Sequence, residues 1–101
     1  MSREIIIPPA ATDDPNAVEL LRVWVAQRGL HVVITSDAWK DGATWGIMLG
    51  DLAIHIANML HEQSTQSKSD VLDELRDGFL QELANPVNDP TGSISVDSPE
   101  R

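Results

Sequence analysis

The chain has 101 residues, no cysteine, and a formal net charge of −9 from 7 Lys+Arg and 16 Asp+Glu. These values fit one soluble globular domain and exclude a disulfide, a thiolate metal site and a cysteine nucleophile. The basic residues are scattered, and no apolar run approaches the roughly 20 residues that span a bilayer, so we expect neither nucleic acid nor a membrane as partner. With no cysteine and no signal-peptide core, we expect a cytoplasmic protein.

The N-terminal region combines a β-branched run with a proline-rich segment. Ile5–Ile7 predicts a short edge strand, because Pro8 directly after it ends strand pairing. Residues 8–16 contain two turn-forming clusters and are predicted to form a loop.

Residues 19–35 form two alternating apolar runs on either side of Gly29, which predicts a β-hairpin. Gly29 can take the positive φ that a three-residue hairpin loop uses. Residues 16–27 also fit a helical period, so a helix is the competing interpretation. The run Val23-Trp24-Val25 favours the strand.

Two helices are predicted after the hairpin. The first covers residues 42–63, with Asp41 as N-cap and one wide apolar stripe. The second covers residues 69–84, capped by Ser69 or Asp70 and ended by Asn85-Pro86. The fold class is therefore α+β, with a small antiparallel sheet packed against two helices. Because an isolated hairpin is marginally stable, a third strand is expected from the N-terminus or from a partner.

We expect residues 1–86 to form a single domain and residues 87–101 to be a disordered acidic tail, because the tail has little apolar surface. Within the tail, Ser93–Val96 alternates and is the one segment that suggests a further strand.

Asp51 and His55 are the best catalytic candidates. Their i, i+4 spacing places both on one helix face, where a carboxylate can orient an imidazole. The competing interpretation is a solvated helix edge, and no further residues complete a catalytic set. We therefore predict no catalytic residue and favour a protein that is not an enzyme. His55 and His61 are six residues apart, unlike a zinc-binding helix, so no metal and no cofactor are predicted.

Trp24, Trp39 and Trp45 are the three largest side chains of the chain. The usual role of such rings is to fill the core. The alternative is a small-molecule pocket that they line, with Asp51 and His55 as polar anchors, since loop aromatics such as Trp39 often serve recognition.

Small residues recur in the first predicted helix, among them Gly46 and Gly50, and allow another backbone to approach closely. Ile47 and Ile54 lie roughly opposite the main apolar stripe, so this helix is apolar nearly all round and is expected to be buried on more than one side. Either the second helix or a partner chain covers them. The favoured function is a non-enzymatic interaction module whose partner is a second copy or another protein.

The chain also resembles a small bacterial family of about this length that is known only as a domain of unknown function. The resemblance covers residues 5–86 and implies a compact α+β domain with no assigned activity, so it brings no catalytic residue to this chain. It rests on three motifs, Ile7-Pro8-Pro9-x-Ala11, Glu19-x-Leu21-Arg22-Val23-Trp24 and Trp45-Gly46-Ile47-x-Leu49-x-Asp51-Leu52-Ala53-x-His55.

Overall fold

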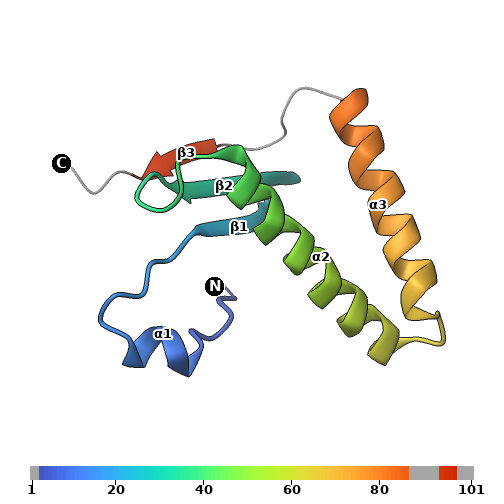
Figure 1. Ribbon diagram of the computed structural model, residues 1–101, viewed down its shortest axis with the longest axis horizontal. Coiled ribbons are helices and arrows are strands. Elements are labelled where there is room, and N and C mark those ends of the chain that lie inside the picture. Colours follow the sequence, from blue (N-terminus) through green and yellow to red (C-terminus); the bar gives the residue numbers. More distant parts are fainter. Residues whose placement is uncertain (1–2, 87–93, 98–101) are drawn as a thin grey trace. The chain divides into compact units, whose positions relative to one another are not determined.

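The computed structural model describes residues 3–86 and 94–97. The chain forms two compact units, which we call the sheet unit (Met1–Ala38 with Thr91–Arg101) and the helix unit (Trp39–Pro90). Together they give the predicted α+β class, with an antiparallel hairpin and two long helices (Figure 1). The prediction of a single domain over residues 1–86 stays a prediction.

The sheet unit contains the hairpin that the alternating residues predict. Strands β1 (Leu21–Ala26) and β2 (Gly29–Thr35) pair antiparallel, with Val23 opposite Val32. The competing helix over residues 16–27 is thereby excluded. The β-branched and aromatic residues of β1 favour an extended backbone over a helix, as the Val-Trp-Val run predicts.

The hairpin turn is tighter than predicted. Gln27 and Arg28 alone connect the strands, with φ of 51° and 64°, and Gly29 already pairs with Ala26 as the first residue of β2. A two-residue connection with two positive φ values has the twist that matches the flanking strands. The positive φ values of this two-residue turn fall on Gln27 and Arg28, and Gly29, which the sequence predicts to be part of a three-residue loop, lies in β2.

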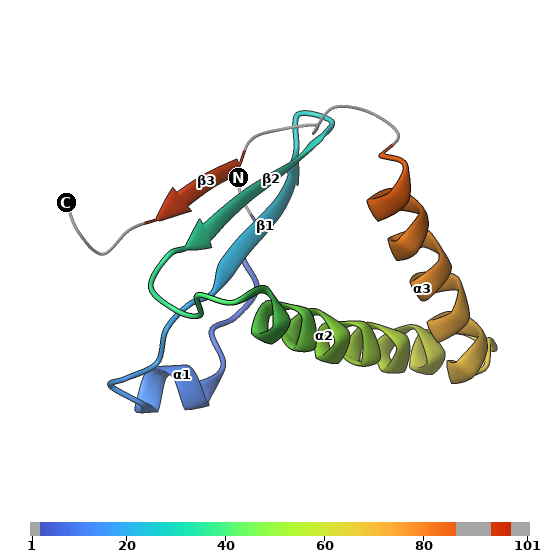
Figure 2. The same ribbon diagram turned by 45° about the horizontal axis from the view of Figure 1, so that its top comes forward.

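The third strand is not the predicted one. Ile5–Ile7 forms no strand and is largely exposed, whereas β3 (Ile94–Asp97) pairs with β2 in parallel, with Val32 opposite Ile94. The sheet is therefore mixed, and β2 lies between β1 and β3 (Figure 2). For these four residues the structure has a strand where the sequence predicted disorder. Residues 87–93 and 98–101 of the predicted tail lie outside the described residues.

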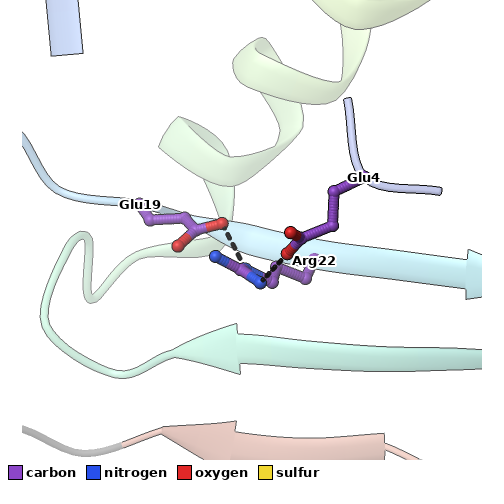
Figure 3. Close-up of polar contacts among 3 residues, drawn as sticks. All are labelled: Glu4, Glu19 and Arg22. Carbon is purple, nitrogen blue, oxygen red and sulfur yellow. Dashed lines mark hydrogen bonds and ion pairs between the residues drawn. The ribbon is translucent and has the colours of Figure 1, made fainter. Parts of the chain in front are cut away.

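The predicted N-terminal loop contains one short helix, α1 (Pro9–Asp13). Pro9 begins it because a proline at the first helical position has the helical φ and lacks an N–H that would stay unpaired. Before α1, Glu4 reaches β1 through Arg22, whose Nη1 donates to Glu4 Oε2 at 3.1 Å and whose Nε donates to Glu19 Oε2 at 2.7 Å (Figure 3). The bond to Glu19, followed by the charges of both glutamates, raises the pKa of Arg22. All three side chains are exposed, so this cluster contributes little stability.

The helix unit contains α2 (Gly42–Gln63), with the predicted bounds, and α3 (Lys68–Ala84). Ser67, two residues earlier than predicted, caps α3 by accepting a hydrogen bond from the N–H of Asp70 at 3.1 Å. In the connection, the His61 ring Nδ1 lies 2.7 Å from Gln66 O. None of the described helices is long and apolar enough to cross a membrane.

Candidate functional site

The first turn of α2 is held by its N-cap. Asp41 Oδ2 accepts a hydrogen bond from the backbone N–H of Thr44 at 2.9 Å, and Thr44 Oγ1 donates to the same oxygen at 2.7 Å. These hydrogen bonds, the side-chain one first, lower the pKa of Asp41, because they favour the ionised carboxylate. Asp41 therefore fixes where α2 begins, as predicted.

Two of the three tryptophans contact each other just at this point. Trp45 Nε1 donates to the carbonyl oxygen of Trp39 at 3.0 Å. The two rings meet edge to face, with centroids 5.2 Å apart and an interplanar angle of 73°. Trp39 thus folds back on the first turn of α2, which gives this pair a structural role beside the predicted recognition role.

The third tryptophan belongs to the other unit. Trp24 lies on β1, is half-buried, and stands opposite His31 on β2. The His31 ring Nε2 lies 3.0 Å from Ala26 O. The predicted pocket residues are therefore divided between the sheet unit and the helix unit.

Asp51 and His55 form the predicted pair on α2. His55 Nε2 lies 3.3 Å from Asp51 Oδ2, and both side chains are 71% exposed. Trp45 precedes Asp51 by six residues, which places the two about 120° apart around the helix axis. Helix geometry thus sets Trp45 and Asp51 on different faces of α2. The ligand-binding role of these residues stays a prediction.

Metal-ligating side chains do not gather in the described residues. Among residues 3–86 and 94–97, no group of three or more His, Asp or Glu side chains could hold an ion.

The four predicted interface residues of α2 lie at the surface. Ile47 and Ile54 are 75% and 46% exposed. A Cβ atom added at Gly46 or Gly50 meets nothing within 4 Å. The small residues of α2 have two interpretations, tight packing within the subunit and contact with a partner chain. In the described part of the chain, neither glycine packs against another segment of the subunit.

The small residues of α2 also include Ala57, which is covered further along the helix. Ala57 is fully buried, and so is Val71 near the start of α3. The two helices lie closest near the connection between them and diverge toward their other ends (Figures 1 and 2). The two helices therefore cover each other near the connection, and α3 leaves Gly46 and Ile47 in the N-terminal half of α2 uncovered.

The divergence also exposes apolar residues of α3 that the sequence analysis did not assign to a surface. Phe79 and Leu83 recur at helical spacing in the sequence of α3, but only the angle between α2 and α3 shows that α2 does not cover the distal half of α3 (Figure 1). The exposed large apolar side chains of the two helices are Ile47, Leu49, Leu52, Ile54, Ile56, Met59, Leu60, Phe79, Leu80 and Leu83.

The sequence of this chain matches the model of a known family. The family described as "Domain of unknown function (DUF5076)" matches residues 4–87. The chain belongs to this family. The match covers the sequence motifs on which the resemblance rested and confirms that resemblance, and the family description assigns no activity.

One solved structure has a closely similar fold. It is described as "a putative pyruvate dehydrogenase from the photosynthetic bacterium Rhodopseudomonas palustrus CGA009" and is 27% identical to this chain, with a TM-score of 0.74. The match covers 90% of this chain and 93% of that one. A comparison with curated proteins found no match.

Proposed function

We propose that this domain is a non-enzymatic interaction module that forms a homodimer through α2. The observation that carries the proposal is the exposure of Ile47 and Ile54 beside the open backbone at Gly46 and Gly50. Two isoleucines seven residues apart lie on the same side of a helix, and the glycines next to them let a second helix approach closely. Close approach brings many atoms into contact over a short length of helix.

The amount of exposed apolar surface supports the same proposal. Soluble monomers rarely leave a contiguous apolar patch of more than a few hundred Å² in water. Ten large apolar side chains of α2 and α3 are exposed, and Ile47 and Ile54 lie on the opposite side of α2 from Leu49, Leu52 and Ile56, so the proposed interface covers part of this surface. Covering such a surface is the usual reason for dimer formation.

The charges of α2 favour a second copy over nucleic acid or a membrane surface. The helix contains no Lys or Arg, and its acidic side chains are Asp51 and Glu62. The absence of cations argues against phosphate groups as the partner of this face, and Asp51, four residues after Ile47 and three before Ile54, is the acidic side chain that lies between the two isoleucines. We propose the cytoplasm as location, which agrees with the absence of cysteine.

The test is the mass in solution, measured by light scattering at micromolar concentration. We expect at least twice the chain mass of 11.1 kDa for the wild type and a smaller mass for Ile47→Asp. Ile6→Asp is the matched control, because Ile6 is an isoleucine outside the helices that is 86% exposed, against 75% for Ile47. A wild-type monomer, or an Ile47→Asp variant that keeps the wild-type mass, contradicts the proposal.

A further inference from the structure

The outer edge of β1 has no strand partner in the part of the chain that the structure describes. The strand order is β1-β2-β3, so β2 is central and β1 ends the sheet (Figure 2). β1 is six residues long and contains neither proline nor lysine, the residues that usually protect an edge from pairing. Its unpaired N–H and C=O groups are a template for another strand.

The hydrogen bonds of the hairpin show which backbone groups point outward. The N–H of Thr35 donates to Leu20 O at 3.0 Å, so the backbone of Leu20 faces β2. Residues of an antiparallel strand alternate between facing the partner strand and facing away from it. The backbones of Leu21, Val23 and Val25 therefore face the outer edge. Val23 and Val25 are also 50% and 82% exposed.

We infer that β1 pairs antiparallel with β1 of a second copy, centred on Val23. This register places Val23 opposite Val23 of the second copy, and Leu21 of each copy opposite Val25 of the other. Every outward-facing backbone group of Leu21, Val23 and Val25 then has a partner. It also places Arg22 opposite Trp24 of the second copy, where a guanidinium and an indole attract each other. Centring the pair on Arg22 instead sets two arginines opposite each other and shortens the overlap.

The charges at the two ends of β1 identify a second copy as the occupant. Glu19, which also bonds to Arg22 of its own chain, precedes the strand, and Arg28 follows it. When two identical strands run antiparallel, the acidic end of one lies beside the basic end of the other. A strand that is acidic at one end and basic at the other is complementary to itself in this orientation and in no other.

This inference goes beyond the α2 interface, because it concerns the sheet unit and names a backbone-paired contact. It predicts one continuous sheet in the order β3-β2-β1-β1-β2-β3 across the two copies. Such pairing gives affinity through main-chain hydrogen bonds and register through the side chains opposite each other.

Cysteine cross-linking tests the register directly, because the chain has no cysteine of its own. Residues opposite each other in a hydrogen-bonded pair have Cα atoms about 5.5 Å apart, within reach of a disulfide. We expect Val23→Cys to form a covalent dimer under mild oxidation. Val25→Cys is the matched control, since its two copies lie four residues out of register, about 14 Å apart. A mixture of Leu21→Cys and Val25→Cys is expected to cross-link.

The outcomes separate this inference from the proposed function. The β1 pairing is wrong if Val23→Cys does not cross-link, or if Val25→Cys by itself cross-links as fast as Val23→Cys. In that case a lower mass for the Ile47→Asp variant than for the wild type still supports the α2 interface. If Val23→Cys cross-links selectively and Ile47→Asp keeps the wild-type mass, the β1 pairing stands and the α2 interface is wrong. A monomeric wild type that does not cross-link overturns both.

Discussion

The indole N–H of Trp45 bonds to the carbonyl oxygen of Trp39 at 3.0 Å, and the two rings also meet edge to face. One side chain of α2 thus holds the segment that leads into the helix by both a polar and an aromatic contact. The five residues between them include Asp41, whose cap bond to Thr44 defines the helix start.

The Trp39–Trp45 contact predicts a specific effect of losing the indole N–H. Trp45→Phe keeps an aromatic ring but leaves the Trp39 carbonyl without this donor, so we expect a loss of about 1 kcal/mol in unfolding free energy, measured by urea denaturation. Trp39→Phe is the control, because its backbone carbonyl and a ring remain. Equal losses in the two variants argue against the hydrogen bond as the cause.

The N-cap of α2 predicts a pH dependence at low pH. The pKa of Asp41 lies below its ordinary value of 3.8 in the folded chain, so its stabilising effect is present above that value and is lost as pH falls through the lower folded pKa. Asn is also a good N-cap but does not ionise. At pH 7 we therefore expect Asp41→Asn to unfold near the wild-type temperature. When thermal unfolding is measured between pH 5 and pH 2 at intervals of about one pH unit, we expect Asp41→Asn to lose less stability than the wild type.

The control for this measurement is Asp77→Asn, an exposed aspartate in the interior of α3 that caps no helix. If Asp77→Asn changes the acid transition as much as Asp41→Asn does, the effect comes from net charge alone and the cap explanation fails.

Two helical glycines with open surroundings predict different responses to alanine. A Cβ at Gly78 on α3 or at Gly50 on α2 meets nothing within 4 Å, so both changes favour the helix by roughly 0.5–1 kcal/mol. We expect Gly78→Ala to raise the thermal midpoint at every protein concentration. Gly50→Ala also adds a methyl group to the proposed α2 interface, so we expect it to weaken the dimer on dilution, measured by sedimentation. Identical dissociation of both variants contradicts a close contact at Gly50.

Strand β3 predicts that the end of the chain contributes to stability. Because Ile94–Asp97 pairs with β2, deleting residues 94–101 removes four residue pairs from the central strand. The sequence alone predicts that this segment is part of a disordered tail. We now expect the deletion to lower the thermal midpoint by about 4–8 °C, equivalent to roughly 1 kcal/mol for a domain of this size. Deleting residues 98–101 alone is the control, and an unchanged midpoint in both truncations argues against the β3 pairing.

Local sequence was sufficient for the elements whose signals lie within them. The bounds of α2 follow from Asp41 as cap and a 22-residue helical period, and the hairpin follows from alternating residues on either side of a turn. The Asp51–His55 contact also follows from spacing alone, because one helical turn separates them. In each case the interacting residues are close in the chain, so the backbone geometry already determines that they meet.

Tertiary structure decided the features that join distant residues. No local pattern pairs Val32 with Ile94, because a four-residue strand has a weak signal and its partner lies about 60 residues away in the chain. The composition of α2 also left open which of its faces is covered. Ala57 is buried, while α3 leaves Gly46, Gly50 and Ile47 uncovered, because the angle between α2 and α3 brings the two helices together only near their connection. That angle depends on how whole side-chain rows pack, and packing is a property of two surfaces together.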